Sequence, residues 1–437
     1  MPLAFFRIEY ISLTTCHCLQ KLSIHDDLVV KIQFFDYNEY MKYHYNPFTN
    51  QVMKKFTIKD ILMDNWSAFV RKMTSLNITI RKTIRHEVEK VIGCQDPNNG
   101  YALYGCTKCH NYHHVPFTCK SRFCNTCGAK YSKDRALNMA WKLLDCPHRH
   151  VVFTIPAQLR KYFAHDRTLL NILFTAAADT IKYRFLKVSK SEEYEPGMIC
   201  VLHTFGRDLK WNPHIHMILC EEAIGNSGIW KRFSHINYEA LRRSWQYCLL
   251  KAMNEKINTV AFQALVDKLY ENHKNGFYVN APPVKNFSSQ VVSYILRYAG
   301  RPALAQSRIT DYDGITVSFT YTPHDSNQIV TESLPVFDFI KRLIIHIPER
   351  YFRMIRYFGF YYDKNAKYGQ YIKRAKKMSA HVYKRQKLIH SSWRKRIMFY
   401  FYRDPLKCIK CGALMQLIEL FCDPRRIKYF QPVFNYP

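Results

Sequence analysis

Hydrophobic positions change their spacing several times along the chain, and the changes predict a protein built from both helices and strands. Apolar residues at helical spacing predict helices over residues 57–93, 131–144, 169–186, 238–273, 287–299 and 332–347. Short β-branched or alternating runs predict strands over residues 150–155, 197–204, 214–220, 307–311 and 315–321. The dipeptide Asp313-Gly314, between the last two runs, is a strong hairpin signal. Residues 1–56 are rich in Tyr and Phe and show no clear period.

Composition narrows the class of protein. The 437 residues suggest about three domains, and a hydrophobic fraction of 48% excludes a wholly disordered or fibrous chain. A net charge of +31 predicts a polyanionic partner, with nucleic acid ahead of an anionic membrane surface. No apolar run approaches the ~20 residues that a membrane span needs. Arg7 and Glu9 interrupt the N-terminal apolar stretch, which therefore does not resemble a signal peptide.

The 15 cysteines include CxxC pairs, which are typical of zinc sites in a reducing compartment. Two such pairs close a tetrahedron of thiolates with no open position, so we predict one structural zinc site. The expected ligands are Cys106, Cys109, Cys124 and Cys127. Other residues offer a second site or an alternative set: Cys94, His110, His113, His114 and Cys119. A third pair, Cys408 and Cys411, is followed only by Cys422, so a site there needs a histidine or another partner.

A histidine pair lies in one of the predicted strands. His214 and His216 are two residues apart, so both rings point to the same face and can reach one metal ion. If residues 197–204 pair antiparallel with residues 213–221, His203 completes a cluster of three. Alone, such a pair is more often a surface or core feature than a metal site.

A tyrosine pair lies on the short helix predicted over residues 287–299. Tyr294 and Tyr298 are at i,i+4 spacing, which places both hydroxyls on one helix face. In a chain with 31 tyrosines they could simply be core aromatics. The neighbouring cations Arg297, Arg301 and Arg308 favour a phenolate and can hold phosphate.

These three regions together resemble one known family. The string from His203 to His216, HTFGRDLKWNPHIH, resembles the HUH motif of two-tyrosine rolling-circle transposases. The string from Tyr294 to Ile309, YILRYAGRPALAQSRI, resembles their tyrosine motif. The cysteine cluster, including CKSRFC, resembles the zinc-binding domain of insertion-sequence family ninety-one. The resemblance runs from about residue 90 to 360 with the segment 404–408, and the motifs occur in the family's order.

The resemblance implies an α+β fold with an HUH endonuclease-type antiparallel sheet and helices. A zinc-ribbon-like domain precedes this sheet, and a basic helical region follows it. The expected segments are an unassigned N-terminus (1–56), a helical and zinc-binding domain (57–145), a catalytic domain (146–325), a basic DNA-binding region (326–403) and a partial zinc knuckle (404–437).

The resemblance implies that the protein nicks and rejoins single-stranded DNA at the ends of a mobile element and at target DNA. It also implies a location in the bacterial cytoplasm, near the nucleoid. His214 and His216 would hold Mg²⁺ or Mn²⁺, with His203 the favoured third ligand and Gln290 its rival. A tyrosine would attack the phosphate and form a 5′-phosphotyrosine. The alternatives are a plasmid replication initiator or relaxase with the same chemistry, or a non-catalytic zinc protein that binds DNA. No membrane partner is expected.

A basic tract at residues 364–403 contains no acidic residue and interleaves cations with aromatic side chains. Cations can bind backbone phosphates and aromatic rings can stack on unpaired bases, so we predict a non-specific strand clamp. The alternative is a basic helix face that keeps the protein soluble. The DNA-binding candidates are Arg297, Arg301, Arg308, Lys373, Arg374, Lys384, Arg385 and Arg394.

Overall fold

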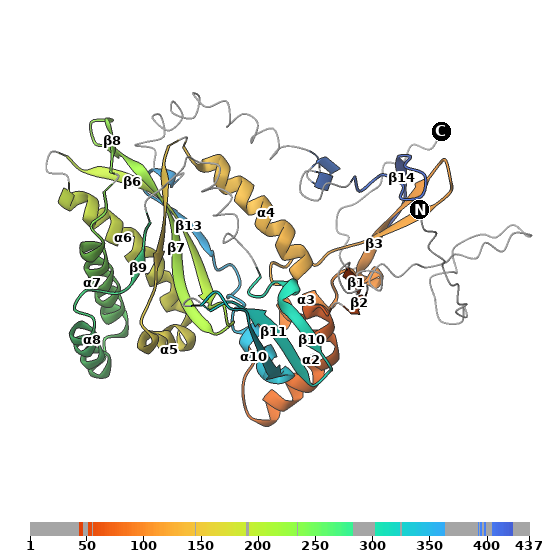
Figure 1. Ribbon diagram of the computed structural model, residues 1–437, viewed down its shortest axis with the longest axis horizontal. Coiled ribbons are helices and arrows are strands. Elements are labelled where there is room, and N and C mark those ends of the chain that lie inside the picture. The colour runs from red at the N-terminus through yellow and green to blue at the C-terminus, as the bar shows by residue number, and fades with distance from the viewer. Residues whose placement is uncertain are drawn as a thin grey trace, which may run out of the picture. The chain divides into compact units, whose positions relative to one another are not determined.

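The computed structural model describes residues 43–46, 51–54, 56–144, 146–188, 192–233, 235–282, 302–323, 326–362, 392, 394–395, 397–398 and 404–422. The chain divides into two units, residues 1–55 and residues 56–437. In the first unit, β1 (Tyr43–Asn46) and β2 (Gln51–Lys54) form an antiparallel hairpin. All other described elements belong to the second unit (Figure 1). The helix predicted over residues 287–299 lies outside the described residues.

The largest described sheet has six strands in the order β13-β6-β7-β5-β9, with β8 paired to β7. Its strands are β5 (His148–Phe153), β6 (Tyr194–Phe205), β7 (Trp211–Gly225), β8 (Trp230–Arg232), β9 (Val279–Asn280) and β13 (Ile355–Phe358). Every pairing in it is antiparallel. The strands predicted over residues 197–204 and 214–220 are confirmed, and both are longer than expected.

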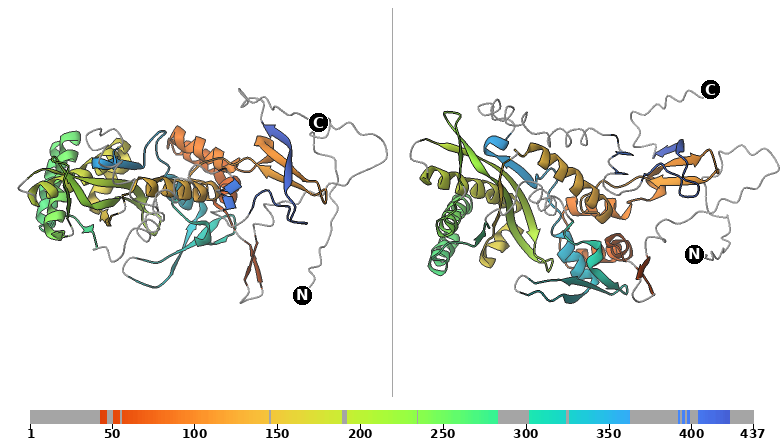
Figure 2. Two further views of the ribbon diagram at one scale, coloured as in Figure 1. Left: turned by 90° about the horizontal axis from the view of Figure 1, so that it is seen from above. Right: turned by 45° about the horizontal axis from the view of Figure 1, so that its top comes forward.

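One face of this sheet packs against helices that form its main core (Figures 1 and 2). These helices are α5 (Ala157–His165), α6 (Leu170–Val188), α7 (Tyr238–Ile257) and α8 (Val260–Asn272). The helical pattern predicted over residues 238–273 is two helices, because Asn258 turns the chain with a left-handed φ of 46°. Thr259 then caps α8 by accepting a hydrogen bond from the backbone N–H of Phe262.

The opposite face of the sheet packs against the end of α4 (Asn125–Lys142) and against the 3₁₀ turn η5 (Gly359–Tyr361). Leu143 and Leu144, which follow α4, contact this face together with Tyr361. The turn needs Gly359, whose φ is +61°, because a Cβ there would lie 1.6 Å from a backbone oxygen of the neighbouring strand. The helix predicted over residues 131–144 is confirmed, but it begins earlier, directly after Cys124.

A second core joins three helices to a small antiparallel sheet. Its elements are α2 (Ile58–Ser75), α3 (Lys82–Ile92), α10 (Val336–Ile344), β10 (Ile309–Tyr312), β11 (Thr316–Tyr321) and β12 (Val330–Pro335). The predicted hairpin at Asp313-Gly314 is confirmed by the pairing of β10 with β11. The boundary expected between residues 325 and 326 falls inside this sheet.

Two helix predictions in this core need correction. The helix predicted over residues 57–93 is interrupted, because Asn77 adopts a left-handed φ of 54° just after α2 ends. The helix predicted over residues 332–347 begins only at Val336, since residues 332–335 pair with β11 as the end of β12.

A third described sheet joins distant parts of the chain. β3 (Gly100–Cys106) pairs on one side with β4 (Tyr112–Pro116) and on the other with β14 (Met415–Cys422). None of these three strands was predicted, because apolar and polar residues alternate only weakly in their sequences. The segment predicted as a separate C-terminal knuckle therefore contributes a strand to the sheet of residues 100–116. Three short 3₁₀ turns complete the described elements: η2 (Pro97–Asn99), η3 (Arg167–Leu169) and η4 (Gln306–Arg308).

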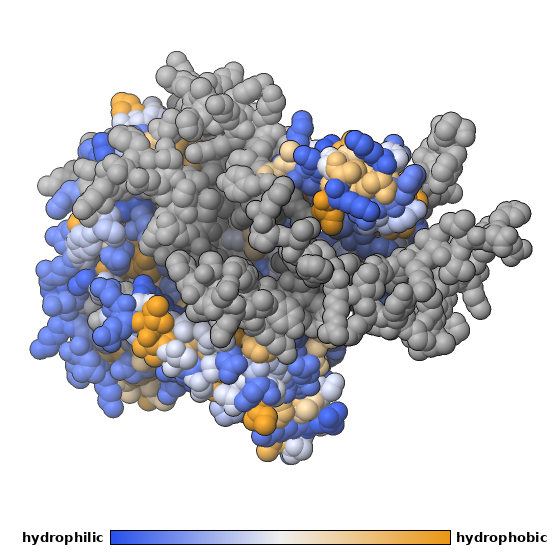
Figure 3. All heavy atoms as spheres, turned by 45° about the vertical axis from the view of Figure 1, so that its right-hand side comes forward, coloured by the Kyte–Doolittle hydropathy of each residue, from blue (hydrophilic) through white to orange (hydrophobic). Residues whose placement is uncertain are grey.

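Hydrophilic side chains predominate on the described surface drawn in Figure 3, with apolar groups scattered among them. Within the described part of the chain, no helix combines the length and the apolar character needed to cross a bilayer.

A buried ion pair fixes one end of the large sheet. Arg149 on β5 donates through Nε and Nη2 to Glu221 on β7, at 3.0 and 2.7 Å, and both side chains are 4% exposed. Arg149 also donates to the carbonyl of Ala281, which follows β9. The pair therefore links three segments of the sheet.

We predict that Glu221→Ala lowers the free energy of unfolding by about 3 kcal/mol, because Arg149 is left charged and buried without its partner. Urea denaturation followed by circular dichroism measures the change. The matched control is Glu239→Ala, which removes an exposed pair with Arg243 on α7 and should change stability little. Equal effects of the two substitutions would contradict the prediction.

Candidate metal centres

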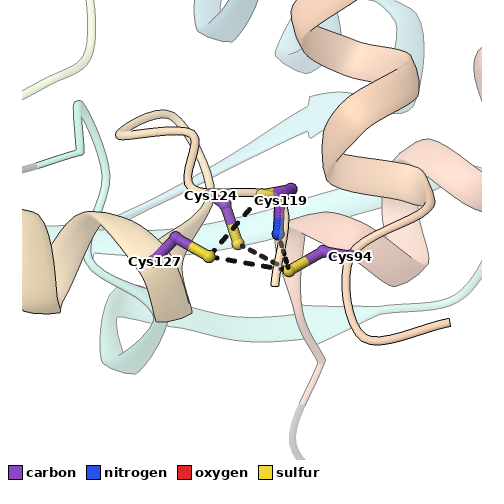
Figure 4. Close-up of side chains that lie close together, drawn as sticks. All are labelled: Cys94, Cys119, Cys124 and Cys127. Atoms are coloured by element: carbon purple, nitrogen blue, oxygen red, sulfur yellow. Dashed lines mark hydrogen bonds between the residues drawn. The ribbon is translucent and has the colours of Figure 1, made fainter. Parts of the chain in front are cut away.

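Four thiols converge where α3 ends and α4 begins (Figure 4). Cys94 follows α3, Cys119 lies before α4, and Cys124 and Cys127 form its first turn. The sulfur of Cys94 lies 3.7 Å from those of Cys124 and Cys127, and Cys119 lies 3.6 Å from Cys127. Backbone N–H groups of Cys119 and Ser121 donate to sulfurs of the cluster. We call these four residues the helical thiol cluster.

Four other thiols converge on the β14-β3-β4 sheet. Cys106 ends β3 and Cys109 lies in the turn between β3 and β4, whereas Cys408 and Cys411 lie in the turn before β14. Cys106 and Cys411 are 3.4 Å apart, and Cys109 and Cys408 are 3.6 Å apart. The two turns are alike. In each one, the carbonyl of the first cysteine, Cys106 or Cys408, accepts a hydrogen bond from the backbone N–H four residues later. We call this group the ribbon thiol cluster.

Both clusters fit zinc. A tetrahedron of zinc–sulfur bonds of ~2.3 Å places its sulfurs about 3.8 Å apart, close to the observed separations. Hydrogen bonds from Cys119 and the other thiols lower the pKa of Cys127, whereas hydrogen bonds with Cys124 and Cys127 raise the pKa of Cys119. Four thiolates this close repel one another, so they ionise together only around a cation.

The predicted grouping of the zinc ligands is therefore corrected. Cys106 and Cys109 do not share a cluster with Cys124 and Cys127, because each CxxC pair joins a different second pair of thiols. Cys94 and Cys119, which the sequence analysis named as spare ligands, complete the helical cluster. The C-terminal CxxC pair finds its missing partners in the N-terminal pair at 106 and 109, not in a histidine.

Three imidazoles gather on the large sheet. His203 on β6 and His214 on β7 are direct cross-strand partners, and His216 follows on the same face of β7. One ring nitrogen from each lies within 4.8 Å of the others. The structure thus brings together the three histidines that the sequence analysis grouped, by the antiparallel pairing that it assumed.

The orientation of the rings leaves lone pairs facing one another. Nδ1 of His214 donates to the carbonyl of Asn212 at 2.7 Å, so its Nε2 carries the lone pair. Nε2 of His214 lies 3.0 Å from Nε2 of His216, close to the ~2.9 Å between adjacent ligands of an octahedral Mg²⁺. The buried side-chain oxygen of Asn212 has no hydrogen-bond partner among the described residues. The three imidazole nitrogens can therefore hold a divalent cation.

A fourth histidine supports the cluster, and sequence reasoning missed it. His150 on β5 places Nε2 2.9 Å from Nδ1 of His216, and their rings stack with centroids 5.1 Å apart. A hydrogen bond at Nδ1 directs the other nitrogen of His216 toward the cluster. The signal was present in the sequence, since His148 and His150 alternate at the start of the strand predicted over residues 150–155.

Burial keeps these rings neutral. It lowers the pKa of His214, lowers the pKa of His216 well below its usual value, and lowers that of His150 to about 4. The charges of neighbouring imidazoles act in the same direction on His216 and His150. Near pH 7 the rings are therefore unprotonated, which is the form that binds a metal ion.

His346, which follows α10, holds the connection between β6 and β7. His346, just after that helix, lies 3.1 Å from Oγ1 of Thr204 and 3.0 Å from the carbonyl of Leu209 through its two ring nitrogens. Leu209 adopts a left-handed φ of 62° and is fully buried. These contacts fix the turn between β6 and β7, which carries Asp208 and Lys210.

Most of the other predicted site residues are not described. Tyr294, Tyr298, Arg297, Arg301 and the rival ligand Gln290 lie outside the described residues, as do Lys373, Arg374, Lys384 and Arg385. Arg308 donates to the backbone carbonyls of Thr320 and Arg207. Arg394 forms an ion pair with Asp404, in which Nε donates at 2.8 Å. These two arginines thus make contacts within the protein.

A basic cavity opens beside His203, with a volume of about 1080 Å³. It lies between α3, the loop of the helical thiol cluster, and the edge of the large sheet. Its cations include Lys82, Lys90, Lys120, Arg122, Arg353 and Arg356. Sequence reasoning missed this cavity because its cations come from three separate stretches of the chain.

We predict that the two clusters hold one zinc ion each, so substitutions within a cluster are not additive. Cys106→Ser and Cys408→Ser should each remove about one zinc per chain, and the double variant should remove no more than either alone. Combining Cys94→Ser with Cys106→Ser should remove about two. Metal analysis of the purified chain measures these losses. Independent losses from Cys106→Ser and Cys408→Ser would show that the two residues do not share an ion.

We predict that His150→Ala weakens Mn²⁺ binding at the histidine cluster by roughly 10- to 100-fold, because His216 loses the contact that orients its ring. Isothermal titration calorimetry measures the affinity. His165→Ala, at the exposed end of α5, is the control and should bind Mn²⁺ as the unchanged protein does. Unaltered affinity in His150→Ala would contradict this role.

Comparisons with known proteins agree with this arrangement. A family model described as a transposase zinc-binding domain matches residues 61–155, and one described as a putative transposase matches residues 197–368. The transposase for insertion sequence element IS801 of Pseudomonas savastanoi pv. phaseolicola is 30% identical over 349 residues, covering 75% of this chain and 82% of the relative. The putative transposase y4qJ of Sinorhizobium fredii (strain NBRC 101917 / NGR234) is 24% identical over 327 residues, covering 69% and 79%. No solved structure matches the chain.

The two family models match the chain in the order zinc-binding domain, then transposase domain. The first match contains the thiols from Cys94 to Cys127, and the second contains the histidine cluster. The chain therefore belongs to insertion-sequence family ninety-one, the transposases that carry an N-terminal zinc-binding domain.

Proposed function

We propose that this transposase cuts and rejoins single-stranded DNA through a tyrosine nucleophile at the histidine cluster. The observation that carries the proposal is the convergence of His203, His214 and His216 on one sheet face, where one ring nitrogen from each lies within 4.8 Å of the others. Such a cluster is suited to holding a cation against a phosphate oxygen. A zinc site of four thiolates has no open position and is suited to structure alone.

His203, His214 and His216 would hold Mg²⁺ or Mn²⁺, which polarises a non-bridging oxygen of the scissile phosphate. His150 orients His216 for this task, and the contact of His214 with the carbonyl of Asn212 orients the second ring. Both supports come from the sheet itself, so the ligands are in place before DNA binds.

The nucleophile we propose is the hydroxyl of Tyr294 or Tyr298. Its oxygen attacks phosphorus and the bond from phosphorus to the 3′ oxygen breaks. The phenol loses its proton as the new ester forms, and the departing 3′ oxygen takes up a proton. The products are a 5′-phosphotyrosine and a free 3′-OH. The phosphodiester energy is kept in the tyrosyl ester, so a 3′-OH can later attack it and rejoin the strand without ATP.

Two tyrosines would allow two alternating cleavages. On the predicted helix, i,i+4 spacing would place both hydroxyls on one face, so each could reach the same cation in turn. One tyrosine would hold the donor strand while the other cuts the target. We propose Arg297 and Arg301, on or just after the same predicted helix, as phosphate contacts that also favour the phenolate.

The basic cavity beside His203 is our proposed path for the DNA strand. His203 lines this cavity together with lysines and arginines that can bind backbone phosphates. The net charge of +31 adds a long-range attraction for nucleic acid. The basic tract at residues 364–403, including Lys373, Arg374, Lys384 and Arg385, would extend the same clamp.

We predict a covalent adduct when the chain is incubated with labelled single-stranded element-end DNA and Mn²⁺, because the tyrosyl ester survives denaturation. Tyr294→Phe and Tyr298→Phe should each reduce adduct formation, and the double variant should abolish it. His214→Ala should slow the reaction roughly 100-fold or more, since the phosphate loses its polarising cation. Denaturing gel electrophoresis measures the labelled protein.

Tyr270→Phe is the matched control, because it removes a phenol from the surface of α8 and should leave adduct formation unchanged. An undiminished adduct in the double tyrosine variant would reject the tyrosine assignment. A lack of any adduct in the unchanged chain would reject single-strand cleavage as the activity.

A further inference from the structure

A fourth group of side chains that could bind a metal lies on the large sheet, separate from both thiol clusters and from the histidine cluster. Cys146, His148 and Cys220 each place one donor atom within 4.8 Å of the others. His148 on β5 and Cys220 on β7 are direct cross-strand partners, and Cys146 lies two residues before His148. The hydroxyl of Tyr361, in η5, is 2.5 Å from Nε2 of His148.

This group is buried from solvent. Cys146 is 5% exposed, His148 is 1% exposed, Cys220 is fully buried, and Tyr361 is 4% exposed. The residues come from three separate stretches of chain, so the fold itself brings their polar atoms into one apolar core. Polar groups in such surroundings need partners for all of their donors and acceptors.

The hydrogen bonds direct the lone pair of His148 Nε2 at the Tyr361 hydroxyl, and an incoming ion would take the place of that hydrogen bond. Nδ1 of His148 donates to the carbonyl of Cys146 at 2.7 Å, which fixes the tautomer with its lone pair on Nε2. The same contact to a backbone carbonyl is typical of histidines that bind metal through the other nitrogen. The backbone N–H of Leu144 donates to the Tyr361 oxygen at 3.2 Å and positions the phenol.

The sulfur atoms of Cys146 and Cys220 are close enough to bind one metal ion together. Cys146 and Cys220 have sulfurs 3.1 Å apart, well beyond the ~2.0 Å of a disulfide. Widening the pair by less than ~1 Å gives the spacing of two thiolates on one zinc ion. Thiolates select soft or borderline cations, and no carboxylate joins this group among the described residues, which disfavours magnesium or calcium.

We propose that Cys146, His148 and Cys220 form a buried zinc site, with the Tyr361 hydroxyl as the fourth donor. When the ion binds, the hydrogen bond from the Tyr361 hydroxyl to Nε2 of His148 breaks and both thiols release a proton to solvent. Zinc then bonds to the two sulfurs, to Nε2 and to the phenol oxygen, and no electrons are transferred. The site would connect β5, β7, η5 and the segment after α4, on the same sheet face as the histidine cluster. It is independent of the tyrosine chemistry proposed above.

The experiment counts zinc in the full-length chain by native mass spectrometry. All proteins carry His214→Ala, so the histidine cluster does not contribute. We expect about three zinc ions per chain, two in the thiol clusters and one here, falling by about one in Cys146→Ser and in Cys220→Ser. Cobalt substitution gives a second readout, because loss of this site lowers the thiolate-to-cobalt charge-transfer absorption by the share of its two thiolates, while the share of the two thiol clusters remains.

The matched control is Cys200→Ser, which removes a fully buried thiol from the other face of the neighbouring strand β6. It should leave both the zinc count and the cobalt spectrum unchanged. A count of about two ions in the parent chain would overturn the proposal even if the serine variants fail to fold. An unchanged count in Cys220→Ser, or a disulfide between Cys146 and Cys220 in peptide mapping, would overturn it as well.

Discussion

The antiparallel pairing of β6 with β7 is the constraint on which the candidate catalytic site depends. It sets His203 opposite His214, and the two-residue period of the strand sends His216 to the same face. On the other face, Leu202 and Met217 are buried against the helices. A slip of one residue would exchange the apolar and histidine faces, so the hydrophobic core itself fixes the register that assembles the cluster.

Helix α4 connects the helical thiol cluster to the large sheet. Cys124, in the cluster, is the N-cap of this helix, and the residues just beyond the other end, Leu143 and Leu144, pack on the sheet face that carries the histidines. Eighteen helical residues span roughly 27 Å. A zinc ion at one end would therefore hold the start of this helix in place, and with it the loop that lines the basic cavity beside His203.

Sequence reasoning succeeded where the relevant contacts are local. The histidine grouping followed from an 11-residue spacing, a short turn and strand alternation, and the hairpin at Asp313-Gly314 followed from its turn residues. The ligand grouping of the cysteines failed because it depends on β14 pairing with β3 across some three hundred residues of chain. Neighbouring CxxC pairs do not reveal which distant pair each will meet. The tyrosine pair stays a prediction, since Tyr294 and Tyr298 lie outside the described residues.

The alternation of side chains that assembles the histidine cluster also explains why a second metal site can lie on the same face of this sheet. Along β7, positions 214, 216, 218 and 220 share one face, so Cys220 points to the side that His216 does. Cys220 pairs with His148, two residues before His150, which contacts His216. An ion bound by Cys220 and His148 would resist sliding of β5 against β7. It would thereby preserve the register on which the contact between His150 and His216 depends.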